Sequence, residues 1–571
     1  MTESLTDNLP LLAGAPNGIK KLRELILELA VRGKLVPQDP SDEPASELLK
    51  RIAEEKARLV AEGKIKKAKA TREELAEVSY EIPSSWAVAS LGQVVEIVRG
   101  ITFPASEKSK EPEPGRVACL RTANVQDEIE WDDLLYIRES FVSRHDQYVE
   151  PHDIVMSMAN SRELVGKVAL IGAELKQKTT FGGFLGVLRP MLIEPRFVMA
   201  LLRTPNARSA LIDSASQTTN IANVSLAKLR PLPFAIPPLA EQHRIVAKVD
   251  ELMALCDRLE ARQTDADSAH AQLVQALLNS LTQAHDAKDF SQNWQRLAEH
   301  FHSLFTIDSS IDALKQTLLQ LAVMGKLVPQ DPSDEPASEL LKRIADEKAQ
   351  LAAEGRIKKQ KPQDEILDEE RPLLLPPAWA WVKPEDFSMK ITDGEHFKPD
   401  TEETGVYFLS AKDIRDDGVS LENPLFISEE TAKKALQRCD PQYGDLLIVS
   451  RGATVGRMCK VNIRERFCLL GSVILIKPSK HVLSEFLSIA LKSPDSFRQL
   501  VNASGSTAQP AIYLRDLKKI ALPMPPLAEQ HRIVAKVDQL IALCDQLKAR
   551  LNQARQVHEQ LACALVEQAV A

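Results

Sequence analysis

The stretch GKLVPQDPSDEPASELLKRIA occupies residues 33–53 and returns unchanged at residues 325–345. The likeness extends over residues 33–67 and 325–359, where only four of 35 positions differ. A repeat at a distance of 292 residues indicates duplicated domains and not a solenoid of short units. The chain of 571 residues therefore carries two copies of one plan, and its length suggests three or four domains.

A second segment is duplicated toward the end of each copy. The sequence PPLAEQHRIVAKVDELMALCDRLEAR at residues 237–262 recurs at residues 525–550 with four differences in 26 positions. The segments in between, about residues 86–235 and 379–524, have diverged. Duplication alone would leave all parts equally alike, so we infer that repeated and divergent parts meet different demands. The alternative is a recent duplication without functional content.

The duplicated segment at residues 237–262 predicts a long helix that begins after two prolines, which suit a first helical turn. Its apolar residues follow heptad spacing, so two helices of roughly 40 residues are expected to bury each other as a coiled-coil pair. The alternative is an amphipathic helix on a globular core. The predicted seam comprises Ile245, Val249, Leu252, Cys256, Leu259, Ala266, Leu273 and Leu277, matched by Ile533, Val537, Leu540, Cys544, Leu547, Ala554, Leu561 and Leu565.

The two divergent segments share an order of features although their residues differ. Each begins at a tryptophan, reaches a turn (RGITFP at 99–104, DGEHFKP at 393–399), continues through short β-rich runs and a helical stretch, and ends in a polar loop. We therefore predict an α+β protein with two variable domains of one fold, separated by long antiparallel coiled-coil helices in a pseudo-two-fold repeat. The predicted segments are helical 1–85, variable 86–236, central helical 237–378, variable 379–524 and helical 525–571.

Charge is distributed in the same way in both variable domains. Residues 154–235 hold 10 Lys and Arg against 4 Asp and Glu, and residues 446–524 hold 12 against 4. The preceding halves, residues 86–153 and 379–445, are acidic, so the net charge of −8 hides two basic regions. Clustered cations favour contact with nucleic-acid phosphates, with an acidic partner protein as the alternative. Two such regions on one pseudo-dyad favour duplex DNA.

Several classes of protein are excluded by what the sequence lacks. No apolar run approaches about 18 residues, so no membrane span is expected. The beginning of the chain has no basic region followed by a long apolar core, and the seven cysteines form no CxxC pair. A cytoplasmic location is therefore expected. Glycine-rich cofactor loops, phosphate loops and a [DNS]-P-P-[FYW] methylation motif are absent, so no catalysis by this chain is expected.

The sequences LRPLPFAIPPLAEQHRIV (229–246) and LKKIALPMPPLAEQHRIV (517–534), with the duplication, resemble specificity subunits of type I restriction–modification systems. DGEHFKP also resembles a turn that often opens their variable domains, whereas RGITFP departs from it, so a role for His396 has no counterpart in the first copy. The resemblance implies that each variable domain reads one half of a bipartite double-stranded DNA target. It further implies that the repeated helices set the spacer length and dock two methyltransferase (M) subunits. Restriction/translocase (R) subunits would join the complex, and S-adenosylmethionine, ATP and Mg would bind those partners and not this chain.

Candidate DNA-binding residues are polar or basic and fall in turns of the variable domains. Arginine suits guanine, and asparagine or glutamine suits adenine, while for each residue a phosphate contact or simple solvation is the alternative. The candidates are Arg99, Arg121, Asn124, Asn160, Arg162, Lys167, Thr219, Asn220, His396, Lys398, Lys412, Arg451, Thr454, Arg457, Thr507 and Gln509. A coiled-coil scaffold with two protein-binding domains is the competing function, and a self-contained restriction enzyme is disfavoured by the missing motifs.

Overall fold

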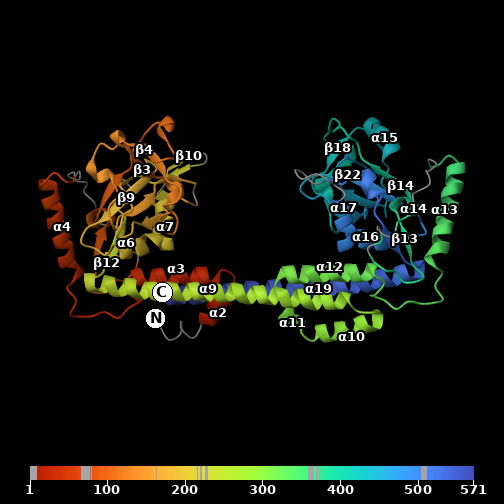
Figure 1. Ribbon diagram of the computed structural model, residues 1–571, viewed down its shortest axis with the longest axis horizontal. Coiled ribbons are helices and arrows are strands. Elements are labelled where there is room, and N and C mark those ends of the chain that lie inside the picture. Colours follow the sequence, from red (N-terminus) through yellow and green to blue (C-terminus); the bar gives the residue numbers. More distant parts are fainter. Residues whose placement is uncertain are drawn as a thin grey trace. The chain divides into compact units, whose positions relative to one another are not determined.

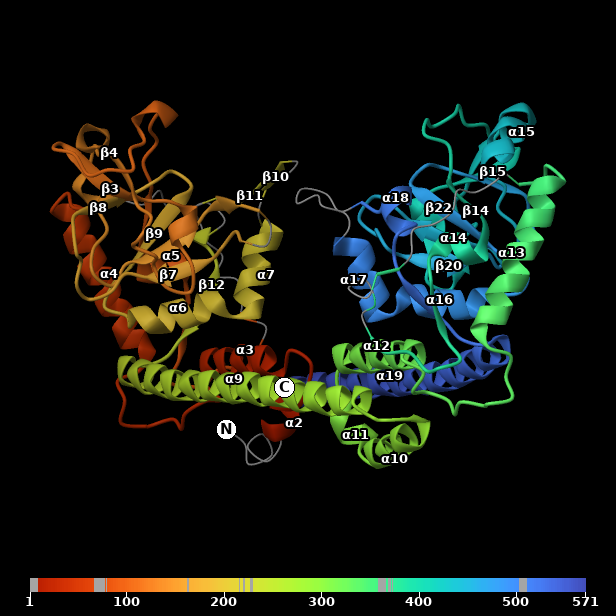
Figure 2. The ribbon, with the colours of Figure 1, turned by 45° about the vertical axis from the view of Figure 1, so that its right-hand side comes forward.

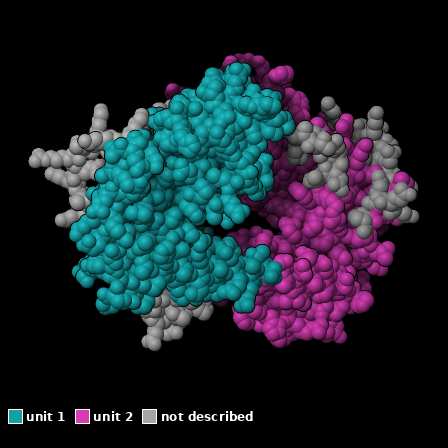
Figure 3. Space-filling view, turned by 60° about the vertical axis from the view of Figure 1, so that its left-hand side comes forward, with its two compact units in different colours: residues 1–265, 554–571 teal, residues 266–553 magenta. Residues whose placement is uncertain are grey.

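The computed structural model describes residues 9–65, 78, 80–161, 164–214, 216–218, 221–225, 229–357, 366–367, 371, 373–502 and 511–570. The chain divides into two compact units, distinguished in Figure 3. Unit 1 comprises residues 1–265 and 554–571, and unit 2 comprises residues 266–553. Each unit therefore contains one variable domain and one copy of the repeated segments.

Unit 1 joins helices from both ends of the chain to the first variable domain (Figure 1). Its helices are α2 (Leu9–Gly14), α3 (Gly18–Val31), α4 (Ala45–Ala61), α5 (Leu91–Val94), α6 (Pro195–Arg203), α7 (Pro205–Ser214), the first part of α9 (Leu239–Thr282) and the last part of α19 (Leu527–Val570). Its strands are β1 (Ala87–Ser90), β2 (Val95–Arg99), β3 (Arg116–Leu120), β4 (Leu135–Arg138), β5 (Ile154–Ser157), β6 (Ala159–Asn160), β7 (Val168–Leu170), β8 (Thr179–Phe181), β9 (Leu185–Pro190), β10 (Ser216–Thr218), β11 (Ile221–Asn223) and β12 (Pro233–Ile236). Short 3-10 turns include η1 (Ala105–Glu107), η2 (Thr122–Asn124), η3 (Glu139–Phe141) and η4 (His145–Gln147).

Unit 2 repeats this plan with the second variable domain (Figure 2). Its helices are the rest of α9, α10 (Ala287–Ala298), α11 (Phe301–Leu304), α12 (Asp308–Val323), α13 (Ala337–Ala353), α14 (Pro384–Phe387), α15 (Glu429–Arg438), α16 (Ser484–Lys492), α17 (Pro494–Asn502), α18 (Leu514–Leu517) and the first part of α19 (Leu527–Val570). Its strands are β13 (Ala380–Val382), β14 (Ser388–Asp393), β15 (Val406–Leu409), β16 (Ile414–Arg415), β17 (Gly418–Val419), β18 (Leu425–Ile427), β19 (Leu446–Val449), β20 (Met458–Lys460), β21 (Phe467–Leu469), β22 (Val473–Pro478) and β23 (Leu522–Met524), with the 3-10 turn η6 (Ala411–Asp413).

Each variable domain is built on a four-stranded antiparallel sheet and a three-stranded mixed sheet. The four-stranded order is β2-β9-β5-β7 in unit 1 and β14-β22-β19-β20 in unit 2. The three-stranded order is β4-β3-β8 and β18-β15-β21, with the last two strands of each parallel. Strand pairs β1–β12 and β13–β23 join the two ends of each domain next to the long helices. The order of elements in the two domains therefore agrees.

The inner strand β5 shows why this sheet is buried on both faces. Its sequence IVMS is apolar without alternation, and all four residues are buried. Alternate side chains of a strand point to opposite faces. Ile154 and Met156 accordingly join the core that contains α6 and the long helices, whereas Val155 joins the core beneath the three-stranded sheet.

The long helices pack in clusters of three and not as a simple pair. In unit 1 the first part of α9 and the last turns of α19 share a core with α3, and Ala562 is fully buried there. In unit 2 the last turns of α9 and the first part of α19 share a core with α12. The predicted pair therefore gains a third helix, because α3 and α12 carry apolar faces of their own.

The predicted seam holds in the first half of each long helix but only in part in the second half, where Leu277 and Leu565 are partly buried against the core. Ile245 and Cys256 are buried as expected, but Leu273 is 51% exposed. Val274 and Leu278, one position further along, take the buried places instead. A straight α-helix drifts relative to a strict heptad, so a seam extrapolated over several turns moves off the buried face. The same displacement occurs in α19, where Ala562 replaces Leu561.

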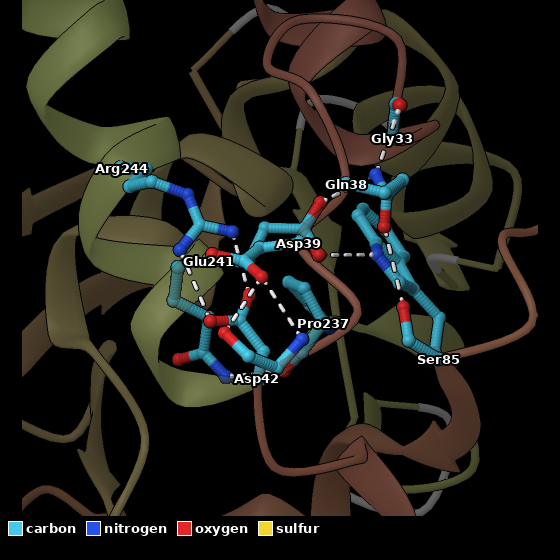
Figure 4. A network of polar contacts seen from close by, with 11 residues as sticks. Gly33, Gln38, Asp39, Asp42, Ser85, Pro237, Glu241 and Arg244 are labelled. Atoms are coloured by element: carbon cyan, nitrogen blue, oxygen red, sulfur yellow. Dashed lines mark hydrogen bonds and ion pairs between the residues drawn. The ribbon is translucent and has the colours of Figure 1, made fainter.

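A fully buried glutamate ties the variable domain to the repeated segments in unit 1 (Figure 4). The carboxylate of Glu241, in the first turn of α9, accepts hydrogen bonds from Gln38 Nε2 (2.7 Å) and Trp86 Nε1 (3.0 Å). Gln38 belongs to the GKLVPQ turn, and Trp86 opens the variable domain. Burial raises the pKa of the Glu241 carboxyl above its ordinary value. We call Glu241 with Gln38, Trp86, Asp42 and Arg244 the junction of unit 1.

Unit 2 contains the same junction. Glu529 accepts hydrogen bonds from Gln330 Nε2 (2.6 Å) and Trp379 Nε1 (2.9 Å), and burial likewise raises the pKa of its carboxyl. Arg532 pairs with Asp334 at 2.6 Å, as Arg244 pairs with Asp42 at 2.5 Å in unit 1. The repeated residues thus fix the start of each variable domain in one way.

The structure confirms the α+β class, the long helices and the internal repeat. Both long helices have 44 residues, close to the length expected from their sequence. None of the described helices has both the length and the apolarity needed to cross a bilayer.

Candidate nucleic-acid interface

Several of the candidate residues of unit 1 lie at one end of the four-stranded sheet. Strands β2 and β5 end there, whereas β9 and β7 begin there, because their neighbours run antiparallel. Arg99 is the last residue of β2, Asn160 lies just beyond β5 in β6, and Lys167 precedes β7. We call this edge the loop end of the first variable domain.

The equivalent loop end in unit 2 gathers more of the candidates. Strand β14 ends at Asp393 and β19 ends at Val449, while β22 and β20 begin beside them. Residues in the turns that follow these strands therefore share one edge. They are His396 and Lys398 after β14, Arg451 and Thr454 after β19, and Arg457 directly before β20.

The side chains at the first loop end differ in whether their polar atoms form hydrogen bonds within the protein. Arg99 is exposed. Asn160 Oδ1 accepts a hydrogen bond from the backbone N–H of Ser161 at 2.9 Å. Lys167 Nζ donates to Gln126 Oε1 at 2.6 Å and so connects the start of β7 to the turn after β3. Arg99 is thus the candidate best placed to reach a ligand here.

Two candidates of unit 1 stabilise the turn after β3. Asn124 is 2% exposed, and its Nδ2 donates to the carbonyls of Glu130 (3.0 Å) and Asp133 (3.1 Å). Its Oδ1 accepts the backbone N–H of Arg121 at 3.0 Å. The guanidinium of Arg121 pairs with Asp133. The amide of Asn124 is therefore engaged inside the domain and is not presented to a ligand.

Lys412 lies in the equivalent turn of unit 2. Its Nζ donates to the carbonyl of Asn423 at 3.0 Å and is half exposed. Asp413 takes the structural place of Asn124, since its carboxylate accepts the backbone N–H of Ser410 at 2.8 Å. The turn is thus held by the same bond in both domains, although the side chain differs.

A cluster of arginine, histidine and lysine side chains lies at the second loop end. Arg438, at the end of α15, pairs with Asp393 and lies with its Nη2 2.7 Å from Nε2 of His396. Because guanidinium nitrogens only donate, Nε2 of His396 accepts this bond. Lys398 is exposed in the same turn. The imidazole is therefore held in one orientation at the edge of the domain.

Arg451 stands beside an aromatic ring at this loop end. Its guanidinium carbon lies 5.9 Å from the ring centroid of Tyr513, and that of Arg515 lies 5.2 Å from the same centroid. An isolated β-bridge joins Arg451 to Ala511 and sets this geometry. Thr454 and Arg457 are half buried, and Arg457 lines a pocket of about 800 Å³ with residues of α12 and α17.

Exposed aromatic residues at the loop ends were missed by sequence reasoning. Phe184, between β8 and β9, is 67% exposed, and Phe397, in the DGEHFKP turn, is 87% exposed. Tyr513 is 37% exposed. An apolar residue at a loop tip, such as Phe184 after Gly182-Gly183, was the available signal. Exposed rings and cations at one edge suit a surface that contacts duplex DNA, because a ring can contact the thymine methyl group while cations contact phosphates and guanine.

Five candidates lie outside the described residues: Arg162, Thr219, Asn220, Thr507 and Gln509. Their assignment to the DNA interface stays a prediction.

The described residues present little that is typical of a catalytic centre. Burial raises the pKa values of the Cys119, Cys439 and Cys459 thiols to about 12, which leaves them protonated and poorly nucleophilic at neutral pH. Among the residues that the structure describes, no group of three or more His, Cys, Asp or Glu could hold a metal ion.

The family model of the type I restriction modification DNA specificity domain matches residues 83–266 and again residues 390–555. The chain belongs to this family of specificity subunits. Among its relatives, the EcoAI specificity subunit of Escherichia coli is 39% identical over 97% of this chain and 94% of that protein. The EcoEI specificity subunit, also of Escherichia coli, is 36% identical over the same shares.

A solved structure shares the fold of this specificity subunit. It comes from work on the "complex assembly and conformational transition of the type I R-M system" and gives a TM-score of 0.50 at 19% identity. The match covers 86% of this chain and 99% of the other. The two matched family regions cover most of the two variable domains and end within α9 and α19.

Proposed function

We propose that the loop end of each variable domain reads one half of a bipartite target in double-stranded DNA. The observation that carries this is the presence of exposed aromatic residues and cations at equivalent edges of two otherwise similar domains. Arg99 and Phe184 occupy the first edge, and Phe397, Arg451 and Tyr513 occupy the second. Because the sheets agree and the side chains differ, two half-sites of different sequence are expected.

The basic halves of the variable domains support this proposal. Each loop end receives turns from the C-terminal half of its domain, which is net positive in both copies. Cations near a duplex release counterions and contribute affinity that falls with salt. A scaffold that binds only proteins would lack such salt-sensitive DNA affinity, so this dependence separates the two functions.

The repeated segments are proposed to serve partner proteins. Identical partners need equivalent surfaces, and the two junctions provide equivalent geometry around Glu241 and Glu529. We assign these segments to docking of two methyltransferase subunits, which would bring S-adenosylmethionine, and of restriction/translocase subunits, which would bring ATP and Mg. The chain itself would direct adenine methylation and restriction without catalysing either.

The long helices are proposed to set the gap between the half-sites. Adding about four residues to the connection at residues 263–310 should change the spacer length and leave both half-sites unaltered, since the loop ends remain intact. A change in the bases read at either half-site would contradict this role.

Exchange of the first variable domain tests whether each variable domain recognises one half-site by itself. Residues 86–235 are replaced by the same segment of a related specificity subunit, and the chain is expressed with its methyltransferase partner. Sequencing of modified bases should show one half-site changed and the other retained. If both halves change, or neither does, the proposed division of reading is wrong.

A further inference from the structure

A buried contact joins a repeated helix to the variable domain in both units, but the carboxylate and the amide that form it exchange sides. In unit 1 the carboxylate of Glu28, on α3, is 8% exposed and faces the start of α7. Its Oε1 accepts the backbone N–H of Asn206 at 3.4 Å, and its Oε2 accepts Asn206 Nδ2 at 3.2 Å. Because the first N–H groups of a helix have no partner within the helix, Glu28 supplies one for α7.

Unit 2 makes the same two bonds with the chemical roles exchanged. Gln320, on α12, occupies the position of Glu28, and Asp495, at the start of α17, occupies that of Asn206. Oε1 of Gln320 accepts the backbone N–H of Asp495 at 3.2 Å. Nε2 of Gln320 donates to Oδ2 of Asp495 at 2.7 Å. Each unit thus pairs one carboxylate with one amide across the same contact.

The neighbouring charges are also exchanged. Arg32 lies 3.4 Å from Glu28 on the repeated helix of unit 1, where unit 2 has Met324. Arg498 lies 2.9 Å from Asp495 within the variable domain of unit 2, where unit 1 has Ser209. Each carboxylate therefore has an arginine on its own segment, and the segment opposite presents a neutral amide.

The two mismatched combinations differ in how much they destabilise the folded state. Glu28 opposite an aspartate would set two carboxylates together, and neither can donate the side-chain bond when ionised. Gln320 opposite an asparagine can still accept the backbone N–H and donate to the amide oxygen. A carboxylate that lacks its donor in a buried contact destabilises the folded state more than a neutral pair does.

We propose that this contact matches each variable domain to its own half of the repeated helices. The first half accepts a domain whose α7-type helix begins with an amide and disfavours one that begins with a carboxylate. The second half tolerates both. The near-identity of the repeats would otherwise leave the two positions interchangeable.

A second contact shows the same compensation between repeated helices. In unit 1 Arg23 of α3 pairs with Glu260 of α9 at 2.7 Å. Unit 2 has Lys548 in the place of Glu260, and it pairs with Asp312 of α12 at 3.0 Å. One of the few differences between the long helices is thus a charge reversal with a matched partner. These pairs are exposed and contribute little energy, so they favour the correct helix pairing only weakly.

The test compares single and paired substitutions in the full-length chain. N206D should lower the thermal midpoint of unfolding by about 2–4 °C, the shift expected from loss of one such bond in a unit of this size. The pair E28Q and N206D rebuilds the contact of unit 2 and should restore the midpoint. E28Q alone leaves two compatible amides but loses the ion pair with Arg32, so it should lower the midpoint less than N206D does.

The matched control uses the other unit. Q320E should lower the midpoint, the pair Q320E and D495N should restore it, and D495N alone should have a small effect. The proposal is overturned if N206D and Q320E are neutral, or if neither paired variant recovers what its single variant lost. Unfolding involves no DNA, so these stability measurements can fail while the proposed DNA reading stands. The biological use of domain matching rests on that proposed function.

Discussion

The junctions and the loop ends of this specificity subunit follow opposite rules. At the junctions the residues are the same in both units, down to the buried carboxylates of Glu241 and Glu529 and their tryptophan and glutamine donors. At the loop ends the strands agree, but β2 ends in Arg99 where β14 ends in Asp393, and Phe184 precedes β9 where Ser472 precedes β22. The difference teaches that repeated polar contacts set the start of each variable domain, whereas the side chains proposed to recognise DNA vary at edges whose strands agree.

The largest expected effect concerns DNA affinity at one loop end. Replacing Arg451 and Tyr513 together with alanine removes a cation and the ring beside it, and should weaken binding by about 100-fold, as loss of a good base contact costs about 1–3 kcal/mol. Fluorescence anisotropy with the assembled methyltransferase complex measures this change. Lys434→Ala, an exposed residue of α15 paired with Glu430, is the control and should leave affinity unaltered. Equal losses of DNA affinity in both variants would show that this loop end is not part of the interface.

The junctions should respond alike to the same substitution. Glu241→Ala leaves the buried donors of Gln38 and Trp86 without an acceptor, and should reduce the free energy of unfolding by about 1–3 kcal/mol. Glu529→Ala should cost a similar amount in unit 2, since its distances match. Urea denaturation with unit-specific probes, such as hydrogen exchange of α4 and α13, provides the measurement. A large difference between the two variants would show that the junctions are not equivalent.

The smallest expected effect is on pH dependence. Burial raises the pKa of Glu241 in the folded state, so the folded protein binds a proton there more tightly than the unfolded chain does. As the pH falls from 7 to 5, the wild type should therefore gain free energy of unfolding relative to Glu241→Gln, which has no proton to bind. Urea titrations at both pH values provide the comparison. If the difference in free energy of unfolding between the wild type and Glu241→Gln stays constant, or changes in the opposite direction, the role of burial is contradicted.

Much of the fold could be predicted because repetition and apolar patterning are local signals. The duplicated segments indicated two units of one plan, and the heptad of Ile245 and Cys256 located the buried face of α9. The error at Leu273 has a physical origin, since small angular drift accumulates along a helix and its neighbours change. The third helix in each cluster depends on packing between distant segments, which no local pattern contains.

The candidate site was predictable only in part. Turn residues such as His396 and Arg451 could be named from their type, and the structure gathers them at one edge. Asn124 has the same chemistry but is engaged in holding a turn, because its neighbours present backbone carbonyls. The exposed ring of Phe184 was overlooked, although its place directly after Gly182-Gly183 indicated a loop tip.

The most direct test of the account is the base preference of a chain altered at one loop end. His396, Phe397 and Arg451 are replaced together with alanine, and the complex with methyltransferase selects binding sites from a random DNA library. The account predicts that base preference disappears in one half-site, while the other half-site and the spacer are retained. Loss of preference in both halves, or an unchanged preference in both, would contradict it.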